Sequence, residues 1–278
     1  MNASSSSPPD TVVFIHGLWM TPRSWEAWGA YYEDRGLTVI TPSWPGLEGE
    51  VEALNRDPSP IGRLDLSRVV DHYAHLIETL PAPPIIIGHS LGGSVTQILL
   101  DRGLGRVGVC VASGTVKGIR DLPISTLRAT SPALRNPFRT SPAPLSAKQF
   151  HYAFANTVPE EESNRIYRRY HIPGAPQVLR DVAFSSFHRH SPATVDFAKA
   201  DRAPLLFIAF EQDHIVPPNA SRHNAEKYTN FGTGTHFQEF PGRPHFPGVP
   251  GWEEVADFAL EWATSQGEQE TQSIRRVA

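Results

Sequence analysis

The stretch from Pro84 to Gly93, with the sequence PIIIGHSLGG, constrains the fold of this chain more than any other. Its three consecutive isoleucines are β-branched and lack polar alternation, which predicts a strand buried on both faces, as in a parallel sheet. Helix-forming sequence follows at once over 94–100, so the chain must turn sharply between the two elements. Gly88 and Gly92 lack the Cβ atoms that would collide across such a turn, and Ser90 is then exposed at its tip.

Other apolar runs alternate with helical patterns along the chain. Between 64 and 80, for example, apolar residues recur at the spacing of one helical face. This alternation predicts an α/β protein with a mostly parallel central sheet and helices on both faces. The predicted strands are 11–15, 37–41, 85–87, 107–112, 203–210 and 235–240, and the predicted helices are 21–34, 64–80, 94–102, 219–227 and 252–262.

The alternation breaks between residues 117 and 200. This stretch is rich in proline and scattered aromatic residues, and it contains nine arginines and three lysines against six acidic residues. A structureless loop of this length is uncommon in a compact domain, so we expect a mainly helical cap, inserted after the sixth core strand and covering Ser90. The expected organisation is a core at 11–116 and 201–264, a cap at 117–200, and flexible tails at 1–10 and 265–278.

Composition excludes several classes of function. With 278 residues, a net charge of −4 and 19% charged residues, the chain gives no support to nucleic-acid binding. It has no apolar run of the roughly eighteen residues that a membrane span needs, and residues 1–10 lack the features of a signal peptide. We therefore expect a cytoplasmic protein.

The sequence also gives no sign of a bound metal or cofactor. Spacings of His, Cys and Asp typical of a metal site are absent, and Gly232–Gly234 does not follow a strand as a nucleotide-binding loop would. Cys110 is the single cysteine and lies in an apolar run, so we expect a buried small side chain and no disulfide within the chain.

The Gly-His-Ser-Leu-Gly segment around Ser90 resembles the nucleophile elbow of the α/β-hydrolase superfamily, specifically its serine esterase and lipase-like members with a cap. In that superfamily the catalytic residues follow the order Ser, Asp or Glu, His. The resemblance implies that Asp213, in EQDHIVP after a predicted strand, is the acid. Glu211 is nearer to the strand and is a rival, and a loop aspartate can also simply cap the next helix.

The same resemblance implies that His245 is the general base. It lies in PGRPHFP, directly after the last predicted strand and before the final helix. His236 competes, but we expect it to point into the sheet, and we expect His214 to face solvent beside Asp213. We therefore expect a Ser90–His245–Asp213 triad.

The segment His16-Gly17-Leu18-Trp19 follows the first predicted strand. The resemblance places one oxyanion donor there and the other on the residue after the nucleophile, which implies the backbone N–H groups of Leu18 and Leu91. Trp19 is an alternative to Leu18. We also expect Trp19 and His89 to contact substrate.

Together these residues imply a serine hydrolase that cleaves a carboxylic ester, lactone or thioester through an acyl-enzyme, without metal or cofactor. The same triad serves C–C bond hydrolysis and cofactor-free haloperoxidase or perhydrolase chemistry in this superfamily, and some relatives are non-catalytic receptors. Branches with a carboxylate nucleophile are set aside because position 90 is serine. The expected partner is a small molecule with an apolar moiety, while its bond type and the oligomeric state stay open.

Overall fold

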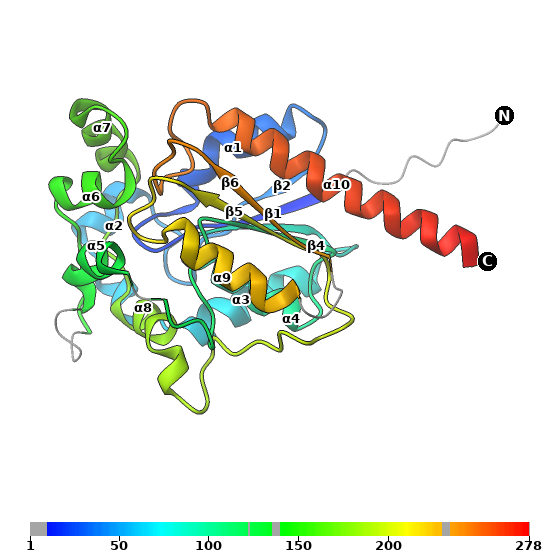
Figure 1. Cartoon of the computed structure of the whole chain (residues 1–278). Coiled ribbons are helices and arrows are strands. Elements are labelled where there is room, and N and C mark those ends of the chain that lie inside the picture. Colours follow the sequence, from blue (N-terminus) through cyan, green and yellow to red (C-terminus); the bar gives the residue numbers. More distant parts are fainter. Residues whose placement is uncertain (1–9, 122, 135–139, 230–233, 278) are drawn as a thin grey trace.

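The centre of the computed structural model is a parallel sheet of six strands in the order β2-β1-β3-β4-β5-β6 (Figure 1). The structure describes residues 10–121, 123–134, 140–229 and 234–277. The prediction of a parallel α/β sheet is confirmed. The strands are β1 (Thr11–Ile15), β2 (Thr38–Ile40), β3 (Ile85–His89), β4 (Val107–Val111), β5 (Leu205–Phe210) and β6 (Thr235–Phe240).

Helices cover both faces of this sheet, so every residue of its central strands β3, β4 and β5 is buried. In β3, Ile85 and Ile87 pack with Phe14 on one face, while Ile86 packs into the cluster on the other face. This arrangement explains why the isoleucine run lacks polar alternation. One face carries α1 (Glu26–Glu33) and α10 (Trp252–Val277), and the other carries α3 (Leu66–Glu78), α4 (Leu91–Asp101) and α9 (Pro218–Thr229) (Figure 1).

The segment between β4 and β5 is mainly helical and lies at the carboxyl ends of the strands (Figure 1). The described residues supply six strands, so this insertion follows the fourth strand of the chain and not the sixth. We call it the cap. Its described helices are α5 (Ile124–Leu134), α6 (Ala147–Phe154), α7 (Glu160–Tyr170), α8 (Pro176–Ala183) and the short 3-10 helix Ser185–Phe187.

Two details differ from the sequence-based expectation. Short helices at Val51–Arg56 (α2) and Ser59–Arg63 lie between β2 and α3, where we predicted no element. The final helix α10 extends to Val277, past the boundary predicted at 265. The predicted tail at 1–10 lies almost entirely outside the described residues.

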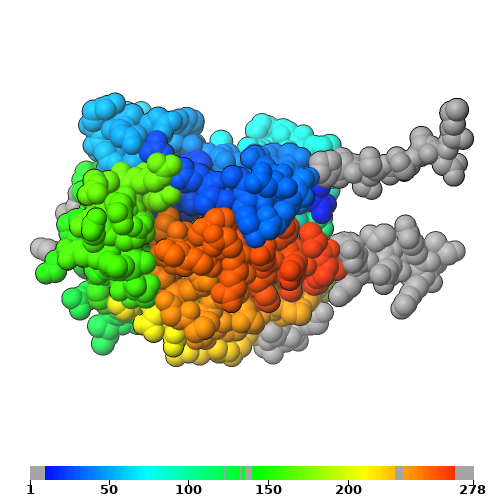
Figure 2. Space-filling view, turned by 90° about the horizontal axis from the view of Figure 1, so that it is seen from above, coloured from blue at the N-terminus to red at the C-terminus, as the bar shows by residue number. Residues whose placement is uncertain are grey.

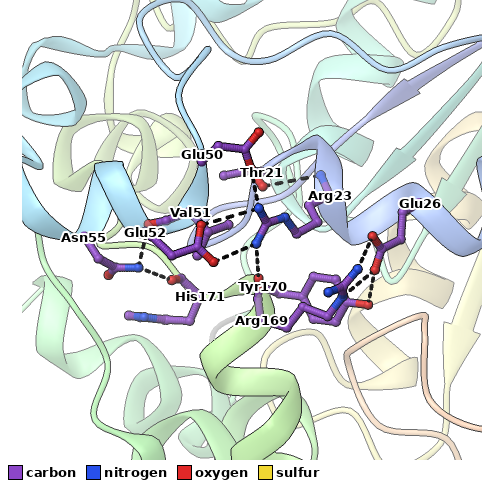
Figure 3. A network of polar contacts seen from close by, with 10 residues as sticks. All are labelled: Thr21, Arg23, Glu26, Glu50, Val51, Glu52, Asn55, Arg169, Tyr170 and His171. Atoms are coloured by element: carbon purple, nitrogen blue, oxygen red, sulfur yellow. Dashed lines mark hydrogen bonds and ion pairs between the residues drawn. The ribbon is translucent and has the colours of Figure 1, made fainter.

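A polar network fastens the cap to the core (Figure 3). The Arg169 side chain of α7 donates two hydrogen bonds of 2.6 Å to the Glu26 carboxylate of α1, and the Tyr170 hydroxyl donates a third, at 2.7 Å. Arg23 pairs with Glu50 and Glu52 and also donates to the Arg169 carbonyl at 3.3 Å. In the space-filling view, the green surface of the cap borders the blue surface of the N-terminal part of the core (Figure 2).

Two buried histidines support the loops beside the cap. His16 Nε2 accepts a hydrogen bond from the Trp44 N–H at 3.3 Å, and His171 Nε2 accepts one from the Leu145 N–H at 3.1 Å. Burial lowers the pKa of each imidazole to about 4. Both rings are therefore neutral acceptors in the folded protein at neutral pH.

The substitution Glu26→Gln tests whether the polar network holds α7 against the core. We expect α7 amides to exchange hydrogen faster, while global stability falls by less than about 1 kcal/mol because the pair is partly exposed. Asp71→Asn is the matched control, since it removes the similarly exposed Asp71–Arg102 ion pair of the core. Unchanged exchange in α7 of Glu26→Gln would contradict a fastening role for the network.

The two buried histidines predict acid sensitivity. Their folded pKa is lowered, so the unfolded state binds more protons between pH 6.5 and 4, and stability is lost as pH falls through this window. At pH 5 each histidine costs about 2 kcal/mol of unfolding free energy. Urea titrations should show that His171→Gln loses about 2 kcal/mol less than the wild type between pH 7 and pH 5. An equal loss of unfolding free energy in His171→Gln and the wild type would contradict the prediction that the lowered pKa of His171 makes the fold sensitive to acid.

Candidate active site

Ser90 occupies a strained turn between β3 and α4. Its backbone has φ 56° and ψ −123°, a left-handed conformation that non-glycine residues rarely adopt. The turn is closely packed, because a Cβ on Gly88 would lie 2.2 Å from the Gly92 carbonyl oxygen and one on Gly92 would lie 2.2 Å from that of Ile15. The Ser90 N–H is held by the Val111 carbonyl at 3.0 Å. Such strain is typical of functional sites, and the packing maintains it here.

Asp213 and His245 form a buried pair on the loops that follow β5 and β6. His245 Nδ1 lies 2.6 Å from Asp213 Oδ2, and both side chains are fully buried. The other oxygen, Oδ1, accepts hydrogen bonds from the N–H groups of Ile215 and Val216 at 2.7 and 2.8 Å. Asp213 therefore both caps its turn and contacts the imidazole.

The opposite nitrogen of His245 has no hydrogen-bond partner among the residues that the structure describes. Nε2 is buried and makes no hydrogen bond, and no bond joins it to the Ser90 hydroxyl in this structure. With Nδ1 donating to Asp213, Nε2 is left as an acceptor. The ring lies 4.7 Å from that of His89, the neighbour of Ser90 in the chain. Catalytic hydrogen bonds are often absent from ligand-free sites and form when substrate binds.

His89 lies apart from the pocket that Ser90 lines. Its Nε2–H donates to the backbone carbonyl of His245 at 2.9 Å, and its ring packs edge-on against Trp25. Burial, reinforced by the nearby His245, holds the pKa of His89 well below its usual range, so the ring is neutral. The structure thus places His89 behind the general-base candidate and not among the described residues that line the pocket.

The three rival residues lie elsewhere. Glu211 is exposed and accepts the Gly242 N–H at 2.7 Å. His236 is exposed on β6 and faces Trp262 on α10, so it does not point into the sheet. His214 is half-buried, and its Nδ1 lies 2.8 Å from the Tyr152 carbonyl oxygen of the cap. The structure thus pairs His245 with Asp213 and gives each of the three rivals a different partner.

The loop after β1 passes directly over Ser90. A Cβ on Gly17 would lie 2.7 Å from the Ser90 Cβ, so only glycine allows this approach. Leu18, Trp19 and Leu91 line the same pocket as Ser90, which brings the backbone of both expected donor segments to the nucleophile. The choice between Leu18 and Trp19 as second donor stays open.

The Trp19 side chain also reaches the cap. Its indole N–H donates to the Ala143 carbonyl at 2.8 Å, and its own carbonyl accepts the Ile172 N–H at 3.0 Å. Its ring packs edge-on against Phe154. The loop after β1 is therefore joined to the cap at Ala143, Phe154 and Ile172.

The end of α6 and the residues just after it contact the loops of both Asp213 and His245. The Phe154 carbonyl accepts the Phe246 N–H at 2.9 Å, and the Phe154 ring lies 5.0 Å from that of His245. Asn156 donates to the Gln212 carbonyl at 3.1 Å. Sequence analysis missed these residues, since no local pattern marks a cap helix as a neighbour of loops about 60 to 90 positions away.

A largely apolar pocket lies between the core and the cap. It contains about 650 Å³ of space not filled by atoms, its open mouth included. A pocket of this size and character suits a small ligand with an apolar part. It is lined by Leu18, Trp19, Ser90, Leu91, Gly114, Thr115, Asp121, Thr126, Thr130, Leu134, Leu179, Val182, Ala183, Ile215, Val216 and Ala220.

Three further observations bear on cofactors and location. Within the described ranges, no group of three His, Cys, Asp or Glu side chains is placed to hold a metal ion. No helix in that part of the chain is both long and apolar enough to span a bilayer. Cys110 is buried, as expected, and burial raises the pKa of its thiol.

Comparisons with known proteins agree with this architecture. The family model described as the alpha/beta hydrolase family matches residues 12–258. A search of curated protein sequences gives no match.

Many solved structures share the fold. A pyrethroid hydrolase from Sphingobium faniae has a TM-score of 0.66 at 19% identity, covering 93% of this chain and 99% of its own. A monoacylglycerol lipase from Paleococcus ferrophilus has a TM-score of 0.64 at 20% identity, covering 94% and 96%. A methylesterase from Arabidopsis has a TM-score of 0.66 at 13% identity, covering 92% and 99%. With its parallel sheet and the family match across most of its length, the chain belongs to the alpha/beta hydrolase family.

Proposed function

We propose that this chain is a serine hydrolase that cleaves carboxylic esters with an apolar moiety. The observation that carries the proposal is the buried His245 ring, whose Nδ1 is bonded to Asp213 while its Nε2 has no partner. A buried acceptor without a donor is costly in a stable fold, and it is explained if Nε2 serves to accept a proton. Ser90 supplies that proton in the proposed reaction.

The proposed reaction has two halves. The Ser90 Oγ attacks the ester carbonyl carbon while its proton passes to His245 Nε2, and the Asp213 carboxylate stabilises the imidazolium that forms. Collapse of the tetrahedral intermediate breaks the bond to the alcohol oxygen, which receives the proton from His245. Water then attacks the acyl-enzyme, again deprotonated by His245, and releases the carboxylic acid with Ser90 restored.

Backbone amides stabilise the oxyanion in this proposal. The N–H groups of Leu91 and of Leu18 or Trp19 are the donors, because both segments meet at Ser90. Each such donor contributes about 3 kcal/mol to the transition state. Main-chain donors need no particular side chain. At these positions the backbone N–H can therefore stabilise the oxyanion while the apolar side chain lines the pocket.

Pocket character and the comparisons favour esters. The walls are mainly aliphatic, and the pyrethroid hydrolase, monoacylglycerol lipase and methylesterase of similar fold carry names of ester-cleaving enzymes. Lactones and thioesters present the same carbonyl to Ser90 and belong to the same proposal.

The triad assignment is tested by three substitutions. Ser90→Ala should abolish turnover of p-nitrophenyl esters and covalent labelling by a fluorophosphonate, because the nucleophile is removed. His245→Ala should lower kcat/KM by about a thousandfold or more. His236→Ala is the matched control and should stay within about twofold, since this histidine is exposed and its ring contacts Trp262 of α10. A folded wild type that neither turns over esters nor reacts with the fluorophosphonate would overturn the proposal in favour of a binding protein.

His89 has a separate, positioning role in this proposal. His89→Phe keeps a ring but removes the donor to the His245 carbonyl, so kcat should fall about tenfold with little change in KM. His89→Gln, which can donate again, should recover part of the loss. His75→Phe on the exposed face of α3 is the control. If all three variants label with the fluorophosphonate at the wild-type rate, His89 does not position the base.

A further inference from the structure

The positive charge of the cap does not reach the substrate pocket. Among the described residues that line the pocket, Asp121 is the one with a formal charge. Three of the described cap arginines are engaged elsewhere: Arg169 pairs with Glu26, Arg165 with two glutamates of its own helix, and Arg128 packs over the Tyr152 ring at 4.3 Å. The electrostatic character of the pocket wall is therefore opposite to that of the cap as a whole.

Asp121 lies at the outer wall of the pocket. It follows β4 at the start of the cap and faces α9, where His223 Nδ1 lies 3.1 Å from each of its carboxylate oxygens. The same residue borders a second cavity that Arg120, His223 and Lys227 also line. Asp121 therefore lies between the two cavities, with 32% of its side chain exposed.

We propose that Asp121 is a specificity-determining residue that selects esters whose pocket-bound moiety is uncharged and disfavours those carrying a second carboxylate. The inference rests on the proposed function and narrows its substrate class. A carboxylate at the end of the bound moiety would meet the Asp121 charge across an apolar cavity, where no described lining residue supplies a compensating cation. The repulsion between two like charges is stronger in an apolar cavity than in water.

The size of the effect is limited by exposure. Asp121 is partly exposed to water and shares its second cavity with Arg120 and Lys227, so the preference it creates is modest, about fivefold in relative kcat/KM. High salt should reduce it further, because the mouth of the pocket is open to solvent.

The test compares two pairs of esters that differ by one carboxylate. On the acyl side, p-nitrophenyl pentanoate is compared with the p-nitrophenyl hemiester of glutaric acid; on the alcohol side, phenyl butyrate is compared with its 4-carboxyphenyl analogue. The readout is the ratio of kcat/KM for the anionic ester to that for the neutral ester. In at least one pair, Asp121→Asn should raise this ratio about fivefold, and Asp121→Lys should raise it further.

His223→Gln separates charge from packing, since it removes the contact but keeps the carboxylate. Its ratio should not rise; a rise equal to that of Asp121→Asn would mean that loosening the contact with α9, and not the charge, changes selectivity. Asp71→Asn, an ion-paired carboxylate outside the pocket, is the second control. Turnover of neutral esters with a ratio unaltered by Asp121→Asn in both pairs would overturn this inference alone. Absence of any Ser90-dependent turnover would overturn the proposed function as well.

Discussion

The strained backbone at Ser90 is the constraint on which the rest of the site depends. A left-handed residue between a buried strand and a buried helix persists only if its surroundings hold it, and here Gly88, Gly92 and Gly17 let three backbone segments meet within contact distance. The same packing fixes the Ser90 N–H on Val111 and brings the loop after β1 over the hydroxyl. One strand-to-helix turn thus brings Ser90 next to both segments that are the proposed oxyanion donors, and the parallel order of the sheet brings the loops of Asp213 and His245 to the same edge.

The cap contacts the candidate site as well as covering it. Its residues contact the loop after β1 through Trp19, the loop of Asp213 through Asn156 and the loop of His245 through Phe154. The network around Glu26 holds the α7 end of the cap against the core (Figure 3). Residues of α5 and α8 line the pocket together with Ser90, so the cap supplies much of the pocket wall.

The parts of the fold and site that could be predicted from sequence are those that depend on residues close together in the chain. The isoleucine run, the glycines of the turn and the 3.6-residue periodicity define the sheet and its covering helices, and the order of motifs identified Ser90, Asp213 and His245 as candidates before their spacing was known. The contact between Asp213 and His245 could be seen only in the structure. His89 was expected at the substrate, but at the end of β3 its side chain turns behind the loop of His245. The cap shows why the rest could not be predicted, because its proline-rich sequence gives no strong periodicity and its key residues, such as Asp121 and Phe154, gain their roles from distant neighbours.

The most direct measurement is a crystal structure of the protein after reaction with a fluorophosphonate ester. The account predicts phosphorus bonded to Ser90 Oγ, with the phosphoryl oxygen within hydrogen-bond distance of the Leu91 N–H and of the Leu18 or Trp19 N–H. His245 Nε2 should then lie within reach of the Ser90 oxygen or the remaining ester oxygen. An unmodified Ser90, or an adduct whose oxygen points away from these amides, would contradict it.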